Sequence, residues 1–126
     1  MTGATVTVAP EDTLGEAAER MAEENVGSAI VLDSGRLIGI LTERDLLGAV
    51  AGRVHTSEAR VREWMTVDPV TATCEMSAEE AMRTMLENGF RHLPVVEDNR
   101  TIGVVSLREL MRAALHVDVG AEGPAD

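Results

Sequence analysis

The feature that most constrains the fold of this chain is an internal repeat. Residues 13–47 align without a gap with residues 77–111, at an offset of roughly 64 residues. One copy is too small to bury its own helices and strands, so two copies are expected to share a core. The identical pairs include Glu16 and Glu80, Ala17 and Ala81, Met21 and Met85, Val31 and Val95, Ile38 and Ile102, Gly39 and Gly103, Arg44 and Arg108, and Leu46 and Leu110.

Each copy begins with a short strand and an amphipathic helix. In the first copy, a strand at 5–8 precedes Thr13-x-x-Glu16, the pattern of a capping box at a helix start. Apolar residues at helical spacing predict a helix to about Glu24, and Asn25 tolerates the left-handed conformation of a C-cap. The second copy repeats this order with a strand at 70–73, Ser77-x-x-Glu80, a helix to Asn88, and Gly89.

Two apolar strands and a second helix complete each copy. The first copy has strands at 29–32 and 37–41 around a polar turn, then a helix at 43–50. The second has strands at 93–96 and 102–105 and a helix at 107–115, and a linking helix is expected at 57–65. The predicted class is α/β (α+β), with two βαββα repeats packed through their sheets in pseudo-two-fold symmetry. The expected organisation is 1–56 for repeat 1, 57–116 for the linking helix and repeat 2, and 117–126 for a flexible tail.

Charge and composition exclude several classes of function. The formal net charge is −11, and such a chain repels phosphodiester backbones, so nucleic acid is not an expected partner. All eleven basic residues are arginine, and Trp64 and Phe90 are the only aromatic residues. No segment is long and apolar enough to cross a membrane, and no signal peptide is legible, so the expected compartment is the cytoplasm. Cys74 is the only cysteine, which excludes an intramolecular disulfide.

Both halves of the chain resemble CBS domains. In the second half the resemblance rests on Trp64 to Val70, Phe90 to Val96, and Gly103 to Leu110. In the first half it rests on Val26 to Leu32 and Gly39 to Leu46. Together the two copies resemble a Bateman module over about residues 5–115.

This resemblance implies a regulatory binding module without catalytic activity of its own. Such pairs commonly bind AMP, ADP, ATP or S-adenosylmethionine in two related clefts and are often homodimers. No catalytic cofactor is therefore expected. The module is expected to act on a separate target protein, whose identity is unknown. The alternative is a structural module that only dimerises and binds no ligand.

The segment Thr42-Glu43-Arg44-Asp45 is the most informative candidate site, because it ends a strand and starts a helix. A helix N-terminus favours an anion, Thr42 could donate to a phosphate, Arg44 could neutralise it, and Asp45 could accept from a ribose diol. This matches the role of the Ser/Thr-x-x-Asp motif in the family. The same residues also form a self-satisfying cap that needs no ligand, and the two readings are compatible. In the second copy the corresponding residues are Ser106, Arg108 and Glu109, where the family motif has aspartate, and the longer glutamate would shift the ribose contact by about one methylene group.

Other candidate residues follow from the same resemblance. Arg91, His92 and Pro94 precede or begin a core strand at a position that supplies basic contacts to phosphate or lines the adenine pocket, although Arg91 and His92 also fit exposed turn residues. Ser28 is the uncharged counterpart of His92, so the two clefts are expected to be chemically unequal. Thr66 and Pro69 resemble the entrance to the second repeat. With few aromatic residues, an adenine is expected between aliphatic side chains, namely Val8, Ile40, Val70 and Val104, each of which also suits a core.

Neither a metal site nor a catalytic site is predicted. The histidines, His55, His92 and His116, are far apart in the chain and have no ligand spacing. No nucleophile with a matching base is legible, and no glycine loop precedes a helix to cradle a phosphate. Gly39 is better explained by close packing of strands, as is its counterpart Gly103.

Overall fold

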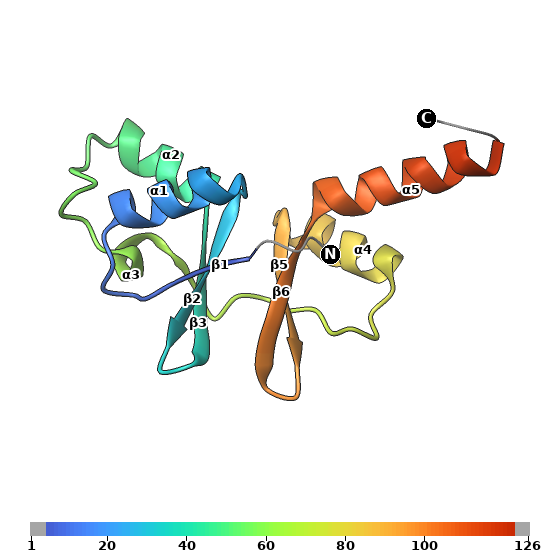
Figure 1. The fold of residues 1–126 in the computed structure, drawn as a ribbon, viewed down its shortest axis with the longest axis horizontal. Coiled ribbons are helices and arrows are strands. Elements are labelled where there is room, and N and C mark those ends of the chain that lie inside the picture. The colour runs from blue at the N-terminus through green and yellow to red at the C-terminus, as the bar shows by residue number, and fades with distance from the viewer. Residues whose placement is uncertain (1–4, 123–126) are drawn as a thin grey trace.

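The computed structural model describes residues 5–122, and for residues 116–122 the backbone. Two sheets face each other in the middle of the molecule, and the helices cover their outer faces (Figure 1). One sheet has the order β1-β2-β3-β4 and the other pairs β5 with β6. The first half contains β1 (Val6–Val8), α1 (Leu14–Glu24), β2 (Ser28–Asp33), β3 (Arg36–Thr42) and α2 (Glu43–Ala51). The second contains α3 (Val61–Trp64), β4 (Thr66–Val67), α4 (Ala78–Asn88), β5 (His92–Glu97), β6 (Arg100–Ser106) and α5 (Leu107–Glu122).

The predicted caps fix both ends of the first helix in each repeat. At the start of α1, the Glu16 N–H donates to Thr13 Oγ1 over 3.1 Å and the Thr13 N–H donates to Glu16 Oε1 over 2.9 Å. Ser77 and Glu80 make the same pair of hydrogen bonds at α4. The two helices end in left-handed residues, Asn25 with φ 57° and Gly89 with φ 74°. These expectations are confirmed.

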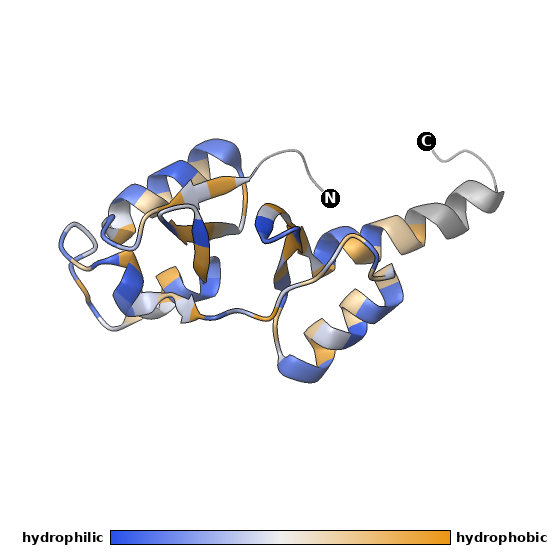
Figure 2. Ribbon diagram, turned by 90° about the horizontal axis from the view of Figure 1, so that it is seen from below, coloured by the Kyte–Doolittle hydropathy of each residue, from blue (hydrophilic) through white to orange (hydrophobic). Residues whose placement is uncertain are grey.

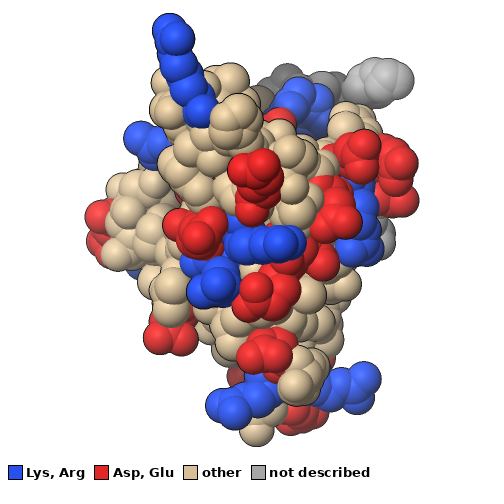
Figure 3. Space-filling view, turned by 90° about the vertical axis from the view of Figure 1, so that its left-hand side faces the viewer, with Lys and Arg blue, Asp and Glu red and all other residues tan. Residues whose placement is uncertain are grey.

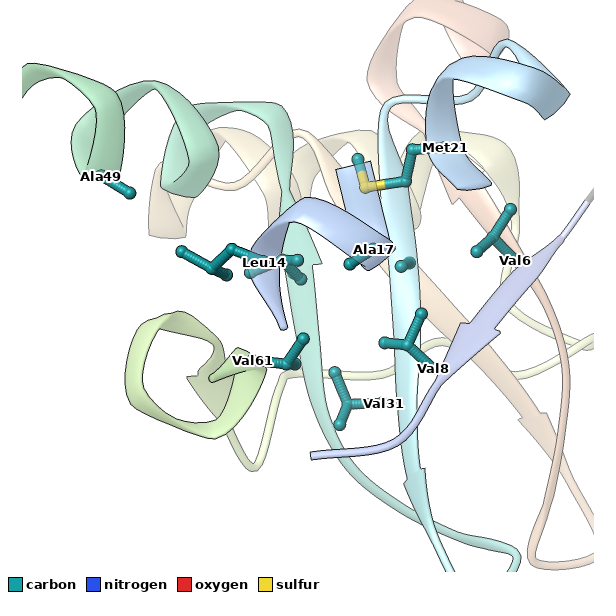
Figure 4. Packing of buried hydrophobic residues seen from close by; sticks show 10 residues of the cluster. Val6, Val8, Leu14, Ala17, Met21, Val31, Ala49 and Val61 are labelled. Atoms are coloured by element: carbon teal, nitrogen blue, oxygen red, sulfur yellow. The ribbon is translucent and has the colours of Figure 1, made fainter. Parts of the chain in front are cut away.

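The first repeat buries a core between its helices and one face of its sheet. Figure 4 shows side chains of α1, β1 and β2 pointing toward one another, with α2 and α3 contributing at the edge. Along α1 and α4, hydrophobic and hydrophilic residues alternate in the sequence (Figure 2), as expected for helices that bury one side. The buried residues of this core are Val6, Val8, Leu14, Ala17, Met21, Ala29, Val31, Leu41, Ala49 and Val61. A smaller core in the second repeat contains Ala72, Ala81, Met85, Leu93, Val95 and Val105.

A second apolar layer lies between the two sheets. Side chains alternate across a strand, so Ile30 lies on the face of β2 opposite Ala29 and Val31. Ile30 is nevertheless fully buried and Ile40 on β3 is 5% exposed, although neither belongs to the helix-side core. Pro94 on β5 is fully buried as well, and β3 contacts β6. Apolar residues of β2, β3 and β5 are therefore buried on the face turned away from the helices, which confirms the prediction that the repeats pack through their sheets.

Several boundaries differ from the predicted ones. The expected strand at 70–73 is reduced to a single parallel bridge between Ala72 and Val95, and the expected linking helix at 57–65 shortens to α3. The short strand β4, which was not predicted, pairs with β3 instead. Helix α5 continues beyond the expected end at Leu115 and occupies the first part of the expected tail. Residues 1–4 of the first repeat and 123–126 of the tail lie outside the described residues, and no described helix has the length and apolar character needed to cross a membrane.

The packing predicts which leucine supports the fold. Leu14 is fully buried, whereas Leu86 on α4 is 69% exposed. We expect Leu14→Ala to lower the free energy of unfolding by about 2–5 kcal/mol, because it removes buried methyl groups and leaves a cavity. Leu86→Ala, the matched control, should change it by no more than about 0.5 kcal/mol. Urea unfolding measures both values, and equal losses would contradict the described packing.

Candidate functional site

A cleft of about 620 Å³ lies where the two repeats meet. This volume is in the range of small-molecule sites. Its walls come from the end of β3, the first turns of α2, the segment after β4, the end of α4 and the start of β5. Nine of the predicted site residues line it, namely Ile40, Thr42, Arg44, Asp45, Thr66, Pro69, Val70, Arg91 and His92.

The helix start at α2 is a complete capping box. The Thr42 N–H donates to Asp45 Oδ2 over 2.9 Å, and the Thr42 hydroxyl donates to the same oxygen over 3.1 Å. The Asp45 N–H reaches Thr42 Oγ1 over 3.4 Å, which is long for a hydrogen bond. The carboxylate is thus fixed through Oδ2, one of its two oxygens. The capping role of these residues is confirmed, and it leaves Oδ1 as a further acceptor.

Close packing of backbone brings the linker to the cleft. Strand β4 pairs with β3, with Ile40 opposite Thr66. A Cβ on Gly39 would lie 2.6 Å from Met65 Sδ and 2.9 Å from the Thr66 carbonyl oxygen. Only a glycine leaves room for β4 at this position of β3, as the sequence predicted. The pairing of β4 with β3 places Thr66 at the cleft.

Glu43 and His92 come together from opposite repeats. The Glu43 N–H donates to the Gly27 carbonyl oxygen over 3.1 Å, which holds the start of α2 beside the start of β2. A Cβ on Gly27 would stand 2.9 Å from Glu43 Oε1 and 3.4 Å from His92 Nε2. The carboxylate and the imidazole therefore both lie against the same glycine.

The half-buried His92 has an altered acidity. Burial lowers the pKa of His92 below its ordinary value of 6.5, because desolvation disfavours the charged imidazolium. The carboxylates of Glu43 on α2 and Glu109 on α5 act in the opposite direction on this pKa, and the neighbouring Arg91 lowers it further. Burial dominates, so the ring is mainly neutral at pH 7.

Four residues of the cleft were missed by the sequence interpretation. Glu43 lies inside the predicted segment Thr42-Glu43-Arg44-Asp45, but it was given no role of its own, although its place beside Thr42 at the helix start was a usable signal. Leu47 is 69% exposed and lies one turn further along α2. Phe90 and Gly89 precede Arg91 directly. The aromatic ring of Phe90 lines the cleft together with the aliphatic residues Ile40, Leu47 and Val70.

The remaining predicted residues lie outside this cleft. Val8 belongs to the helix-side core of repeat 1, Pro94 is fully buried, and Ser28 is 6% exposed on the inner face of β2. The other four lie on β6 and α5, at the positions that correspond in the repeat to Ile40, Thr42, Arg44 and Asp45. They are Val104, Ser106, Arg108 and Glu109.

The second helix start has equivalent capping geometry. The Ser106 N–H donates to Glu109 Oε1 over 3.1 Å, and the Glu109 N–H donates to Ser106 Oγ over 3.1 Å. The backbone matches as well, because the Leu107 N–H donates to the Arg91 carbonyl oxygen over 2.8 Å, as Glu43 does to Gly27. The glutamate thus preserves the cap. Among the described residues, no group of three or more histidine, cysteine, aspartate or glutamate side chains could hold a metal ion.

The acidity of His92 predicts a pH-dependent stability. Because its folded-state pKa is lowered, the unfolded chain binds more protons than the folded chain as the pH falls below 6.5. The contribution of His92 is therefore fully present above pH 6.5 and is lost as the pH falls toward the folded-state pKa, by about 1.4 kcal/mol per unit between the two pKa values. Urea unfolding of the wild type and His92→Gln from pH 7.5 to 5 measures this. The stability of the wild type relative to the variant should fall on acidification, and a constant difference would contradict the prediction.

Comparisons with known proteins agree with this architecture. A model of the CBS domain family matches residues 1–52 and 61–116. A 17.7 kDa protein from the bps2 3′ region of Acidianus ambivalens is 43% identical over 112 residues, which cover 87% of this chain and 67% of the relative. The crystal structure of the CBS domain NE2398 has a TM-score of 0.84 and 31% identity, covering 89% of this chain and 88% of that chain. The CBS domain protein PAE2072 from Pyrobaculum aerophilum, solved with AMP, has a TM-score of 0.83 and 26% identity, covering 96% and 95%. The chain belongs to the CBS domain family and carries two copies of that domain.

Proposed function

We propose that this protein is a non-enzymatic regulatory module that binds an adenine nucleotide in the cleft between its repeats. One observation carries the proposal: the start of α2 and the basic residues Arg91 and His92, which come from different repeats, line a single cleft. A helix N-terminus and guanidinium groups are both suited to phosphate. The related protein PAE2072 was solved with AMP, which supports this ligand class.

The walls of the cleft divide into chemically different parts. Ile40, Val70, Leu47 and Phe90 offer an apolar surface for a purine base, and Phe90 adds an aromatic ring. In the proposed pose, Asp45 accepts hydrogen bonds from the ribose hydroxyls through Oδ1. The remaining polar groups, Thr42, Arg44, Arg91 and the entrance residues Thr66 and Pro69, would contact the phosphate or the edge of the base.

A second cleft is part of the proposal. Pseudo-two-fold symmetry relates the start of α5 to the start of α2, and both helices start with a capping box. Val104, Ser106, Arg108 and Glu109 would line this cleft, with Ser28 in the place of His92. Because neither Gly27 nor Ser28 is basic, we expect weaker phosphate binding there.

A ligand in the first cleft would touch both repeats, so its binding energy would favour one relative placement of them. We propose that a homodimer in the cytoplasm presents this change to a separate target protein. S-adenosylmethionine, ADP and ATP are alternative ligands of the same cleft. The proposal concerns sensing, and no described group of residues suggests a chemical reaction.

A structural module that only dimerises is the second candidate. Its support is that both capping boxes are satisfied without a ligand, and that large apolar side chains are exposed on the helices. These side chains are Leu47, Val50, Leu86, Met111 and Leu115. Under this function, nucleotides would leave the melting temperature unchanged.

The proposed function predicts a specific effect of the α2 cap. We expect ligand-free protein to bind AMP. Thr42→Ala should weaken that binding by at least about tenfold, because the Thr42 hydroxyl, which donates to Asp45 Oδ2 in the free protein, would turn to donate to the charged phosphate, and this bond is lost in the variant. Titration calorimetry measures both affinities. Asp45→Asn should weaken binding as well, because the amide is a poorer acceptor for the ribose hydroxyls.

Thr13→Ala is the matched control, because it removes the same side chain from the capping box of α1, outside the cleft. Both variants should lose about 1 kcal/mol of stability, but Thr13→Ala should bind AMP as the wild type does. Equal losses of affinity in the two variants would show that the cap acts through stability alone. If AMP, ADP, ATP and S-adenosylmethionine all fail to bind the ligand-free protein, the sensing function is wrong.

A further inference from the structure

An acidic side chain, Glu43, lines the cleft together with the basic residues Arg91 and His92. Its Oε1 atom and His92 Nε2 lie within 3.4 Å of one point, the position of a Cβ on Gly27. Arg91 and Arg44 line the same cleft. A phosphate group beside His92 Nε2 would therefore also lie near the Glu43 carboxylate.

The local backbone fixes this placement. Glu43 is the first residue of α2, and its N–H is bonded to the Gly27 carbonyl oxygen. Gly27 has no side chain, and a Cβ there would be 2.9 Å from Glu43 Oε1, so the glycine leaves the space into which the carboxylate folds. The corresponding backbone bond in the second repeat joins Leu107 to Arg91, where neither residue is acidic. The carboxylate is thus a feature of the first cleft alone among these two helix starts.

The charges that line the cleft are balanced. Glu43 and Asp45 oppose Arg44 and Arg91, while burial lowers the pKa of His92 and keeps it mainly neutral at pH 7. The two carboxylates also lie in the first turn of α2, where they already interact favourably with the helix dipole. Basic and acidic side chains are intermixed on the face that Figure 3 shows, which is built from the first repeat. The capacity of the cleft for additional negative charge is therefore small.

Resting on the proposed function, we infer that Glu43 is a specificity-determining residue that selects nucleotides with one phosphate over those with three. A triphosphate carries about two more negative charges than a monophosphate. Each of these charges is repelled by the Glu43 carboxylate, and the cleft has no surplus of basic groups to offset the repulsion. The base and ribose contacts are shared by both ligands, so the discrimination arises at the phosphate end.

The test compares AMP and ATP binding to the wild type and Glu43→Gln by titration calorimetry, in buffer with EDTA so that ATP keeps its full charge. We expect the wild type to bind AMP more tightly than ATP. In Glu43→Gln the ATP affinity should rise about three- to tenfold and the AMP affinity at most about threefold, because the carboxylate is exposed and partly screened. The gain should shrink as salt rises above about 0.1 M, where the Debye length falls below about 10 Å.

Two variants separate position from net charge. Glu19→Gln on α1 removes the same charge from an exposed position outside the cleft and should leave both affinities unchanged. Glu43→Asp keeps the charge and should keep the preference for AMP. An unchanged ATP-to-AMP affinity ratio in Glu43→Gln, an equal shift in Glu19→Gln, or a wild type that prefers ATP would each overturn the inference while leaving the proposed function intact. Failure of every variant and of the wild type to bind any nucleotide would overturn both.

Discussion

The contact between the two sheets is the interaction on which the rest of the structure depends. Each repeat has a helix-covered face, but its central strands carry apolar residues on both faces. Ile30 is fully buried on the side of β2 that faces away from α1. Left alone, one repeat would expose this second face to water at a cost of about 25 cal/mol for each Å² of apolar surface. Pairing the repeats removes that surface and fixes their relative placement.

The same contact creates the cleft, because it brings segments of different repeats to one place. The start of α2 belongs to the first repeat, and the start of β5 belongs to the second. The segment between the repeats reaches the cleft through β4, which pairs with β3. At Gly39 on β3 there is no room for a Cβ, because the Thr66 carbonyl oxygen would lie 2.9 Å from it. The cleft is therefore a product of the tertiary arrangement, and neither repeat contains it by itself.

The repeat explains why so much of the fold could be predicted from the sequence. Capping boxes and left-handed caps are local features, and their residues at Thr13, Ser77, Asn25 and Gly89 have the predicted geometry. Elements whose limits depend on distant packing were predicted less well. Strand β4 has only two residues and no periodicity, and the expected strand at 70–73 pairs with the second sheet through Ala72 alone.

The residues of the candidate site also differ in whether local sequence or distant packing places them. Residues at the helix start, such as Thr42 and Asp45, were found because their spacing is a local signal. Phe90 was missed because no local pattern marks it, and the packing of one repeat against the other is what places it in the same cleft as the start of α2. Val8 fits an apolar wall equally well in sequence, yet the parallel pairing of β1 with β2 places it in the core beneath α1. Sequence pattern identifies an apolar residue, but the strand neighbours decide what covers it.

Duplication keeps the backbone the same at the two helix starts while their side chains diverge. The backbone bonds from Glu43 to Gly27 and from Leu107 to Arg91 are equivalent, yet the first joins a glutamate to a glycine and the second a leucine to an arginine. The cleft combines the helix start of repeat 1 with the strand start of repeat 2. Arg91 and Glu43 therefore line the same cleft, although the two residues lie far apart in the chain. A substitution at the strand start of one repeat thus changes the cleft formed by the helix of the other. The chemistry of this cleft is therefore set jointly by both halves of the chain.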